Sequence, residues 1–240
     1  MTGIKIISLD RVGSTNDYAK RIAASRSDDV LITAREQTAG RGRMGRTFFS
    51  PEGGIYMSLV LHPDMKADKT DIITVMAAVA VAKTIESVFG VRAGIKWVND
   101  IYIGGKKVCG ILTEGKFDPA GNGFEYAVLG VGVNLSEPQG GFPDEIKDIA
   151  GTVCQTVSDD QRREFTERFL SEFYRIYESR RGFLEEYKKR SVVLGREIEY
   201  LSQGEVHRGL AVDITDRAEL VIKDAQGIKT LRSGEIKIIL

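Results

Sequence analysis

The sequence predicts an α+β protein in which a mixed β-sheet flanked by helices is followed by a small β-barrel. Three observations on the 240-residue chain lead to this prediction. Two long segments carry apolar residues at helical spacing, several short β-rich segments lie between residues 4 and 133, and short alternating segments fill about the last fifty residues. The change of pattern places a domain boundary near residue 190, between residues 1–190 and 191–240.

The N-terminal part of the chain mixes strand and helix signals. Ser14 followed by Asp17 resembles a capping box, which predicts a helix that ends near residue 25. Residues 37–46 show no periodicity, and the Pro-Glu-Gly-Gly sequence at 51–54 predicts a turn. Short apolar and β-branched runs predict three strands, over residues 4–9, 30–34 and 55–61.

The strongest helix signal covers residues 68–89, where apolar side chains occupy most of the helix surface. We expect this helix to be buried, with Gly90 as its C′ residue. Strand signals return after it, and Gly104-Gly105 marks a hairpin. The predicted strands cover residues 93–97, 101–103, 108–114 and 124–133.

A second long amphipathic helix is predicted to begin at Ser158 or Asp159 and to continue past Gly182 towards Arg190. Its aromatic side chains recur every three or four residues, which is typical of a stripe that faces the core. Alternating runs separated by Gly or Asp turns then predict the strands of the small barrel, over residues 197–201, 208–214, 219–223, 228–232 and 235–240.

The charge balance argues against a general nucleic-acid or membrane binder. Lys and Arg number 34, as do Asp and Glu, so the formal net charge is zero. Binding to polyphosphate or to anionic lipid by charge needs a surplus of cations, which leaves only a local basic patch for that purpose. Apolar residues make up 42% of the chain, enough for a sizeable core.

Nothing in the sequence predicts secretion, membrane insertion or a structural metal site. The first ten residues lack the apolar core and cleavage pattern of a signal peptide. The longest apolar run, residues 75–82, is far shorter than the ~18–20 residues that span a bilayer. Cys109 and Cys154 share no zinc-site spacing with His62 and His207. We therefore predict two reduced thiols, a cytoplasmic location and no metal ligands.

Residues 40–46 are the densest chemical feature, because three arginines alternate with three glycines there. Glycine lets a ligand approach the backbone, and arginine supplies planar bidentate donors, so the segment predicts a loop that binds phosphate or carboxylate oxygens. It is not a P-loop, because the Phe-Phe-Ser-Pro sequence at 48–51 cannot continue as the required helix. Two alternatives stay open: a solvated basic turn, and an Arg-Gly segment that binds RNA.

Three further segments suggest a site. Lys96 precedes the only Trp of the chain and an Asn-Asp turn, a pattern that fits an inward-facing lysine and equally a solvated edge residue. Gly130 and Gly132 interrupt a buried strand, where glycine loses packing unless a ligand or another backbone comes close. The Ser-Thr-Asn sequence at 14–16 is either a helix cap alone or a set of neutral polar binding groups.

Together these segments resemble the biotin protein ligase family, the biotin–[acetyl-CoA-carboxylase] ligases, over nearly the whole chain. Residues 14–16 are similar to its STN segment, and Gln37 with residues 40–46 is similar to its Q-x-x-GRGRxGR loop. Val98 stands where the family usually has proline, and Phe48 where some members have tryptophan. The other matches are KWVND at 96–100 to KWPND, KVCGILTE at 107–114 to the strand after it, GVGVN at 130–134 to GxGxN, and RSGE at 232–235 to the SGE turn of the C-terminal barrel.

The resemblance implies a biotin/lipoate ligase-like catalytic domain followed by an SH3-like β-barrel. It also implies a reaction in which biotin and ATP give biotinyl-adenylate and pyrophosphate, and the biotinyl group then passes to one lysine of a biotin carboxyl carrier protein. Only thirteen residues precede Ser14, too few for the DNA-binding domain of bifunctional members. We therefore expect the monofunctional kind, with neither nucleic acid nor membrane as a partner, and we leave a homodimer open.

By the same resemblance, Lys96 takes the catalytic position between the biotin carboxylate and the α-phosphate. Arg41, Arg43 and Arg46 hold phosphate oxygens in a loop that orders around the ligand, and Arg41 and Arg43 are counted with Lys96 as catalytic. Magnesium is expected with ATP, and Asp100 and Glu114 are the candidate carboxylates beside it. The residues assigned to biotin and ATP are Ser14, Thr15, Asn16, Gln37, Gly40, Arg41, Gly42, Arg43, Arg46, Lys96, Gly110, Gly130, Gly132 and Asn134.

Two competing functions belong to other classes. A lipoate or octanoate protein ligase or transferase has a related fold, but its acyl group would leave the neutral polar groups of residues 14–16 and Gln37 unpaired. A non-enzymatic Arg-Gly binder of RNA predicts salt-sensitive binding and indifference to ATP.

Overall fold

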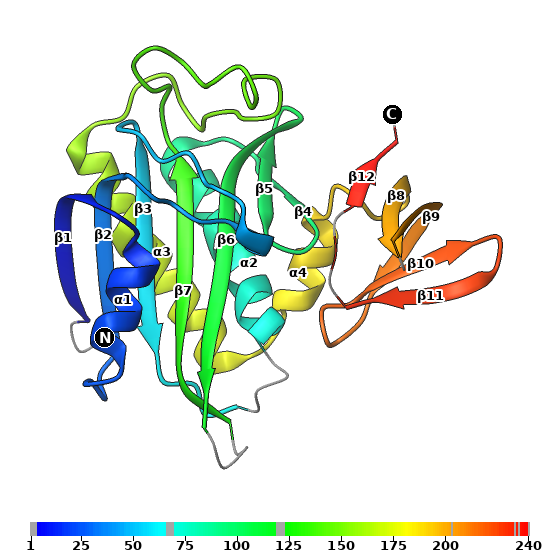
Figure 1. Cartoon of the computed structure of the whole chain (residues 1–240), viewed down its shortest axis with the longest axis horizontal. Coiled ribbons are helices and arrows are strands. Elements are labelled where there is room, and N and C mark those ends of the chain that lie inside the picture. Colours follow the sequence, from blue (N-terminus) through cyan, green and yellow to red (C-terminus); the bar gives the residue numbers. More distant parts are fainter. Residues whose placement is uncertain are drawn as a thin grey trace.

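The structure, a computed structural model, describes residues 4–65, 70–118, 123–202, 204–232, 234 and 236–239. Within this part of the chain, a seven-stranded and a five-stranded sheet carry the fold (Figure 1). The predicted start of the second helix at Asp68 lies outside the described residues. So do Ser233 and Glu235 of the expected SGE turn, and residue 240 of the last predicted strand.

The larger sheet has the strand order β1-β2-β3-β7-β6-β5-β4. β1 and β2 are parallel, and the other neighbouring pairs are antiparallel. β1 and β2 extend beyond their predicted ends, because the two strands stay paired as far as Val12 and Gln37. The strands are β1 (Lys5–Val12), β2 (Val30–Gln37), β3 (Gly54–Leu61), β4 (Gly94–Lys96), β5 (Asp100–Ile103), β6 (Lys106–Phe117) and β7 (Phe124–Asn134).

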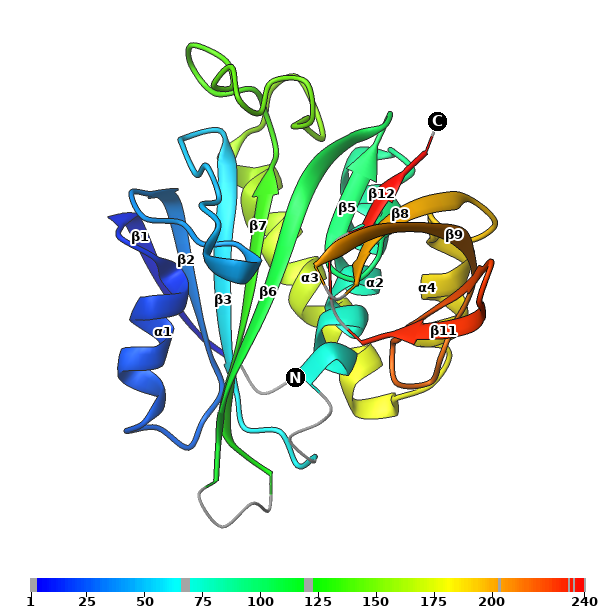
Figure 2. The same cartoon turned by 45° about the vertical axis from the view of Figure 1, so that its right-hand side comes forward.

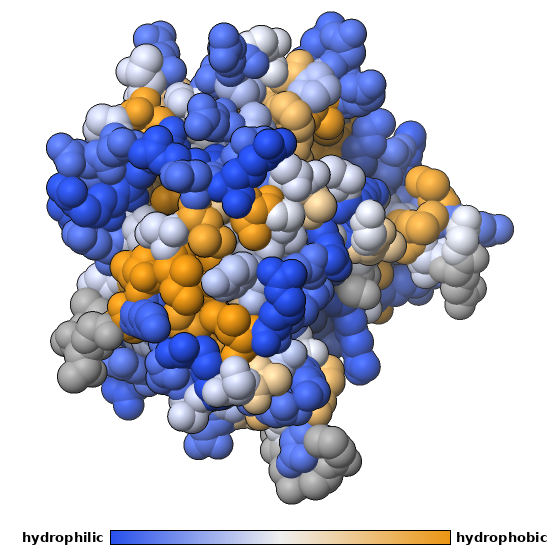
Figure 3. All heavy atoms as spheres, turned by 60° about the vertical axis from the view of Figure 1, so that its left-hand side comes forward, coloured by the Kyte–Doolittle hydropathy of each residue, from blue (hydrophilic) through white to orange (hydrophobic). Residues whose placement is uncertain are grey.

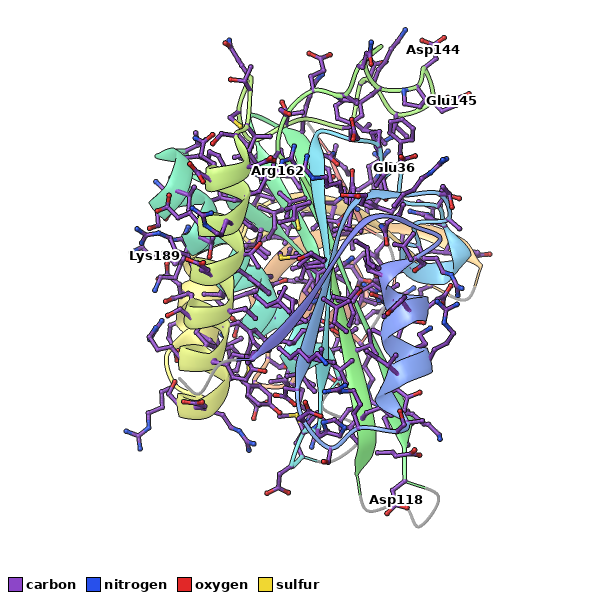
Figure 4. All side chains as sticks on the ribbon, turned by 90° about the vertical axis from the view of Figure 1, so that its left-hand side faces the viewer. Glu36, Asp118, Asp144, Glu145, Arg162 and Lys189 are labelled. Atoms are coloured by element: carbon purple, nitrogen blue, oxygen red, sulfur yellow. The ribbon has the colours of Figure 1, made fainter. Side chains whose placement is uncertain are left out.

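Helices cover both faces of this sheet. α1 (Thr15–Ala23) packs against β2, β3 and β7 on one face. On the other face lie α2 (Thr70–Phe89), which contacts β4, β5 and β6, and α3 (Asp159–Ser179), which packs on α2. Figure 4 shows this arrangement from the side, with α1 in blue on one face and α3 in yellow-green on the opposite one. The sheet is the middle layer between them.

α2 is buried along most of its length, as its apolar surface predicts. Among the described residues, it is the one helix that is long and apolar enough to span a membrane. However, 72% of its most apolar 18-residue stretch is buried inside the structure. Gly90 follows with φ +68°, the left-handed conformation of a C′ glycine, and its N–H donates to Glu86 O at 3.0 Å. The pattern is that of a core helix.

The prediction of one continuous helix past Gly182 is wrong. α3 ends at Ser179, and α4 (Phe183–Arg190) begins after a short turn. Arg180 and Gly182 both take left-handed conformations, with φ +54° and +67°, which ends the helical path and redirects the chain. At the other end of α3, Ser158 forms a complete capping box with Gln161.

The second sheet is antiparallel and has the order β11-β10-β9-β8-β12 (Figure 2). Its apolar side chains, including Ile198 and Leu220, belong to the same core cluster as α2 and the larger sheet. The predicted fold class is confirmed by a mixed sheet flanked by helices and a separate C-terminal antiparallel sheet. The strands are β8 (Glu197–Ser202), β9 (Glu205–Ile214), β10 (Leu220–Asp224), β11 (Gly227–Leu231) and β12 (Ile236–Ile238).

The turn between β4 and β5 is where the C-terminal part of the chain meets the larger sheet. Trp97 Nε1 donates to Ala218 O, in the turn between β9 and β10 of the second sheet, at 2.8 Å. The buried hydroxyl of Tyr187 in α4 donates to Val98 O at 3.0 Å. The N–H of Val192 donates to Ile95 O at 2.9 Å. These contacts fix the turn that carries the lysine motif.

Candidate active site

A cavity of about 220 Å³ opens beside the N-terminus of α1. Its wall comes from that helix end, the β2–β3 loop, the β4–β5 turn and strands β6 and β7, together with Met57 of β3 and with Gly234 and Ile236 at the C-terminal end of the chain. The structure therefore brings together segments that are far apart in the sequence. Twelve of the fourteen predicted site residues line the cavity: Ser14, Thr15, Asn16, Gln37, Arg41, Gly42, Arg43, Arg46, Lys96, Gly110, Gly130 and Gly132.

Gly40 and Asn134 do not line the cavity. A Cβ on Gly40 would lie 2.4 Å from Phe48 O and from Ser50 Oγ, so glycine lets the two ends of the loop close on each other. Asn134 is buried at the end of β7, where Nδ2 donates to Gly151 O at 3.2 Å. Both residues shape backbone around the cavity, and their contact with a ligand stays a prediction.

Neutral polar side chains form a connected network at one end of the cavity. Gln37 Oε1 accepts hydrogen bonds from Thr15 N at 2.8 Å and Thr15 Oγ1 at 3.0 Å, while Gln37 Nε2 donates to Ser50 Oγ at 3.0 Å. Ser58 Oγ lies 2.8 Å from Thr15 Oγ1 and 2.6 Å from Asn16 Oδ1. Because Thr15, Asn16, Ser50 and Ser58 are buried, these groups are held in place before any ligand binds.

Ser14 caps α1 as predicted, and its Oγ accepts from Asp17 N at 3.4 Å. The carboxylate of Asp17 forms an ion pair with Arg41 of the loop, so the arginine loop is tied to the helix that carries the neutral residues.

The arginine loop rests on few contacts. Within it, Gly42 N donates to Arg46 O at 2.7 Å, and Met44 and Gly45 take left-handed conformations with φ +56° and +75°. Arg43 Nη1 donates to Asn99 Oδ1 at 3.2 Å, which connects the loop to the lysine motif. This segment lacks periodicity in the sequence, and in the structure its one helical element is a single turn of 3₁₀ helix, Arg43–Gly45.

Lys96 ends β4 and lies opposite Asp100 across the hairpin. The peptide bond between Trp97 and Val98 is cis. Burial lowers the pKa of the half-buried Lys96 ammonium, and the charge of Asp100 opposes that shift. Lys107 Nζ forms an ion pair with Asp100 Oδ1 at 2.7 Å. This end of the cavity therefore holds two lysines and three arginines around one lining carboxylate among the described residues.

The glycines of β6 and β7 leave room for side chains of the loop and of α1. Gly110 and Gly132 are cross-strand partners, and a Cβ on Gly132 would lie 2.7 Å from the Phe48 ring. A Cβ on Gly130 would lie 2.3 Å from Asn16 Oδ1. The close approach expected at these positions is made, in this structure, by protein side chains.

Among the residues that the predicted site set leaves out, three have clear roles in the structure. Lys107 lines the cavity and begins the KVCGILTE segment, where a lysine next to a buried strand was a usable signal. Ser58 is the one serine in the apolar strand β3, and it is fully buried beneath Thr15 and Asn16. Phe48 was noted only as a departure from tryptophan, yet its ring covers the glycine pair.

The described residues offer little to hold a metal ion. No group of three or more His, Cys, Asp or Glu side chains is arranged for metal binding in the described part of the chain. Asp100 is paired with Lys107, and Glu114 accepts hydrogen bonds from Asn16 and Lys20. A divalent cation here would need most of its oxygen ligands from a bound phosphate chain and water.

The arrangement suits a ligand with an uncharged polar head and an anionic tail. Buried neutral donors and acceptors select the head, and the cations stabilise phosphate or carboxylate oxygens. Negative charge that builds up where two anions meet would be stabilised at Lys96 and Lys107.

Comparisons with known proteins agree on one family. Residues 8–134 of this chain match the model of the biotin/lipoate A/B protein ligase family. Residues 193–238 match the model of the biotin protein ligase C-terminal domain. The bifunctional ligase/repressor BirA of Bacillus spizizenii is 35% identical, over 98% of this chain and 74% of its own. The biotin–[acetyl-CoA-carboxylase] ligase of Mycobacterium tuberculosis is 29% identical, over 94% and 86%. The biotin protein ligase of Aquifex aeolicus in complex with biotin and ATP has a TM-score of 0.78 and 26% identity, over 98% of both chains.

Proposed function

The chain belongs to the biotin/lipoate A/B protein ligase family, and from this membership we propose that it is a biotin protein ligase. It activates biotin with ATP to biotinyl-5′-AMP, releases pyrophosphate, and transfers the biotinyl group to a lysine of a biotin carboxyl carrier protein. The ligases of Mycobacterium tuberculosis and Aquifex aeolicus align with nearly the whole chain, which favours biotin over lipoate or octanoate.

One observation carries the proposal: a single cavity joins a neutral polar end to a cationic end. Thr15, Asn16 and Gln37 offer uncharged donors and acceptors, the chemistry that the ureido ring of biotin requires. A lipoyl or octanoyl chain would leave without a partner the hydrogens of Asn16 Nδ2 and Gln37 Nε2 that no group in the described part of the chain accepts, and an unsatisfied buried donor costs about 1–3 kcal/mol. The cations of the other end match the triphosphate of ATP.

The first half-reaction brings two anions together. A biotin carboxylate oxygen attacks the α-phosphorus, a bond to the bridging oxygen breaks, and pyrophosphate leaves with the electron pair. Lys96 and Lys107 both line the cavity. We assign Lys96 to the carboxylate and the α-phosphate, and Lys107 would add a second charge nearby. Charges already in position stabilise the negative charge that develops in the transition state.

The second half-reaction transfers the acyl group. The neutral amine of the carrier lysine attacks the carbonyl carbon of the mixed anhydride, AMP leaves, and the amine loses a proton. Arg41 and Arg43 belong to a loop that crosses the cavity, and their contacts with Asp17 and Asn99 support a role in retaining the adenylate.

Magnesium is part of the proposal as the partner of ATP. Asp100 is the one lining carboxylate among the described residues, so it is the side chain that would help to hold the ion. Magnesium commonly keeps several waters and binds one or two carboxylates together with substrate phosphates, which fits this sparse site. When bound, magnesium would neutralise part of the charge of the phosphates.

The remaining expectations also stay proposals. A cytoplasmic location is supported by the free thiols of Cys109 and Cys154, and the absence of a nucleic-acid partner by zero net charge. The division at residue 190 is supported by the end of α4 at Arg190 and by the C-terminal family match at 193–238. A carrier protein as the acyl acceptor follows from the family's reaction.

A homodimer is supported by the outer edge of the larger sheet. β1 is its first strand, and an unpaired strand edge can pair with a second copy of the chain. Ile6 of β1 is 43% exposed. Figure 3 turns this side of the molecule forward and shows apolar side chains gathered in one area among polar ones. Light scattering at several concentrations tests this association.

The deciding experiment is a mass measurement on a biotin carboxyl carrier domain after incubation with this protein and Mg-ATP. With biotin present, we expect the mass to rise by one biotinyl group on the acceptor lysine. Parallel reactions with lipoate or octanoate, and with a lipoyl carrier domain, serve as controls. Modification by lipoate in preference to biotin would assign the protein to the alternative function.

A further inference from the structure

Glu114 of β6 contacts the neutral end of the cavity from behind. Its Oε2 accepts a hydrogen bond from Asn16 Nδ2 at 2.8 Å, and its Oε1 accepts one from Lys20 Nζ at 2.5 Å. Glu114 is half-buried, whereas Asn16 is 6% exposed and lines the cavity. The reaction proposed above gives this carboxylate no chemical task, so its position calls for another explanation.

The contacts of Glu114 determine which way round the Asn16 amide lies. An ionised carboxylate only accepts hydrogen bonds, so the amide must turn its NH2 group towards Glu114. Asn16 Oδ1 then faces Ser58, whose hydroxyl donates to it at 2.6 Å. Gly130 supplies the space, because a side chain there would clash with Asn16 Oδ1. Asn16 is thus held by hydrogen bonds to Glu114 and Ser58, in the space that Gly130 leaves open.

One hydrogen of this amide is left for a ligand. The nitrogen carries two hydrogens, and Glu114 accepts one of them. Within the described part of the chain, the other has no acceptor at hydrogen-bonding distance. A buried donor that borders a cavity favours a ligand that brings an acceptor to it.

We propose that Glu114 is a positioning residue that fixes the Asn16 amide so that it presents an N–H donor to the biotin head. The donor selects a ligand with an acceptor oxygen, such as the ureido carbonyl. Lys20 assists by holding the second carboxylate oxygen from α1. This inference rests on the proposed function, since it names a determinant of the biotin specificity of the same site.

Glu114→Gln tests the inference with almost no change in shape. A glutamine can donate to Asn16 Oδ1, so the Asn16 amide is free to turn over and present its oxygen to the ligand. We expect the KM for biotin to rise about tenfold or more, the range of a hydrogen bond lost near a charged group, while the KM for ATP changes less than about twofold. Selectivity against the biotin analogue with an imino nitrogen in place of the ureido oxygen should fall by a similar factor.

Two further variants separate positioning from structure. Glu125→Gln removes a carboxylate that pairs with Lys116 at 2.9 Å on the neighbouring strand, and it should change neither KM. The double variant Asn16→Asp with Glu114→Gln fixes the contact with the opposite polarity, because a carboxylate at position 16 can only accept a hydrogen bond from the amide at position 114. It should not recover the KM for biotin, since no N–H donor is left at position 16.

The outcomes are distinguishable from failure of the proposed function. Three outcomes would overturn the role of Glu114 and leave the proposed function standing. They are an unchanged KM for biotin in Glu114→Gln, an equal rise in both KM values, and a double variant with normal biotin affinity. A wild-type protein without biotin-dependent exchange of pyrophosphate into ATP would overturn the proposed function, and the inference with it.

Discussion

The two ends of the cavity are held in different ways. At the neutral end, Thr15, Asn16 and Ser58 are buried, and their hydrogen bonds connect α1 to β2, β3 and β6. At the cationic end, Arg41 and Arg46 are exposed, and the loop that carries them includes two left-handed residues and one short turn.

This difference separates a preformed site from one that the ligand completes. Fixed donors recognise a small head group without a large loss of conformational entropy on binding, because they are ordered already. An exposed loop must be ordered by the ligand, which weakens binding but allows the loop to close over a reactive intermediate and to open again. We therefore expect changes at the neutral end to affect recognition and stability, and changes at the loop to affect retention.

The largest effect is expected at Lys96 of the cationic end. Lys96→Ala removes a preorganised charge from the reacting centre, and such losses typically cost ~10²–10³ in rate, or about 3–4 kcal/mol. The half-buried ammonium contributes little packing, so the melting temperature should change little. Biotin-dependent exchange of pyrophosphate into ATP measures the rate.

Lys106→Ala is the matched control for this variant. Lys106 is an exposed lysine at the start of β6, and its Nζ donates to Lys147 O at 3.1 Å, outside the cavity. The Lys106→Ala variant should exchange pyrophosphate into ATP at the rate of the wild type. A Lys96→Ala rate within about threefold of the wild type would remove Lys96 from the mechanism, because a lost donor of this kind normally costs far more.

A pair of alanine substitutions tests the contrast between the ends directly. Gly130→Ala would place a Cβ 2.3 Å from Asn16 Oδ1, inside the fixed network, whereas Gly132→Ala would place one 2.7 Å from the Phe48 ring, on the loop. Overpacking a rigid site costs about 3 kcal/mol at the upper end of the usual range, and a neighbour that can move lowers this to about 1 kcal/mol. Urea unfolding measures both. Equal losses of stability would show that the loop is as rigid as the network.

Gly130 and Gly132 show which features of the site can be predicted from the sequence and which cannot. Their position in a buried strand correctly predicts a close approach, and strand pattern alone cannot tell whether a ligand or a side chain makes it. Phe48 and Asn16 make it here, and each precedes the glycine that it contacts in β7 by more than eighty residues. Contacts over such a separation depend on the topology of the sheet.

The break between α3 and α4 and the site residues missing from the prediction also depend on features that local sequence patterns do not record. The apolar stripe predicts α3 and α4 as one helix, because left-handed residues such as Arg180 leave no mark on periodicity. Ser58 and Glu114 gain their roles from Asn16, which packs over their strands from α1. The motifs were recognisable from local sequence, whereas the residues that support them became visible only with the fold.

Ligand-induced stabilisation is the next effect in size. Biotin and ATP should each stabilise the folded protein, by about 2.7 kcal/mol at a hundredfold excess over Kd, and lipoate and duplex DNA should not. For biotin the gain should be present without ATP, because the neutral end is preformed. Thermal melts with each ligand measure this. A larger shift with lipoate would favour the alternative acyl group, and a shift with DNA at moderate salt would contradict our interpretation of the loop.

Arg43→Gly should affect retention of the adenylate more than its formation. The variant loses the contact between Arg43 Nη1 and Asn99 and one cation beside the phosphate, a hydrogen bond to a charged group worth about 1.5 kcal/mol or slightly more. We expect biotinyl-adenylate to escape about tenfold faster and to label lysines of a bystander protein, which a streptavidin blot detects. Arg217→Gly, in an exposed turn of the C-terminal sheet, is the control. Label confined to the carrier would remove the retention role from Arg43.

The smallest effect concerns pH. Burial lowers the pKa of Lys96 below its ordinary value of 10.5, and the mechanism uses the charged form, so kcat/KM should be full below this lowered pKa and fall as pH rises through it. Tyr102, whose ring lies 5.6 Å from Lys96 Nζ, does not explain the fall, because burial raises its pKa to about 12. In Lys96→Arg the guanidinium stays charged, so the slower variant should lose this alkaline limb. A limb at the same pH in both proteins would assign it to another group and leave the charge state of Lys96 without influence on the rate.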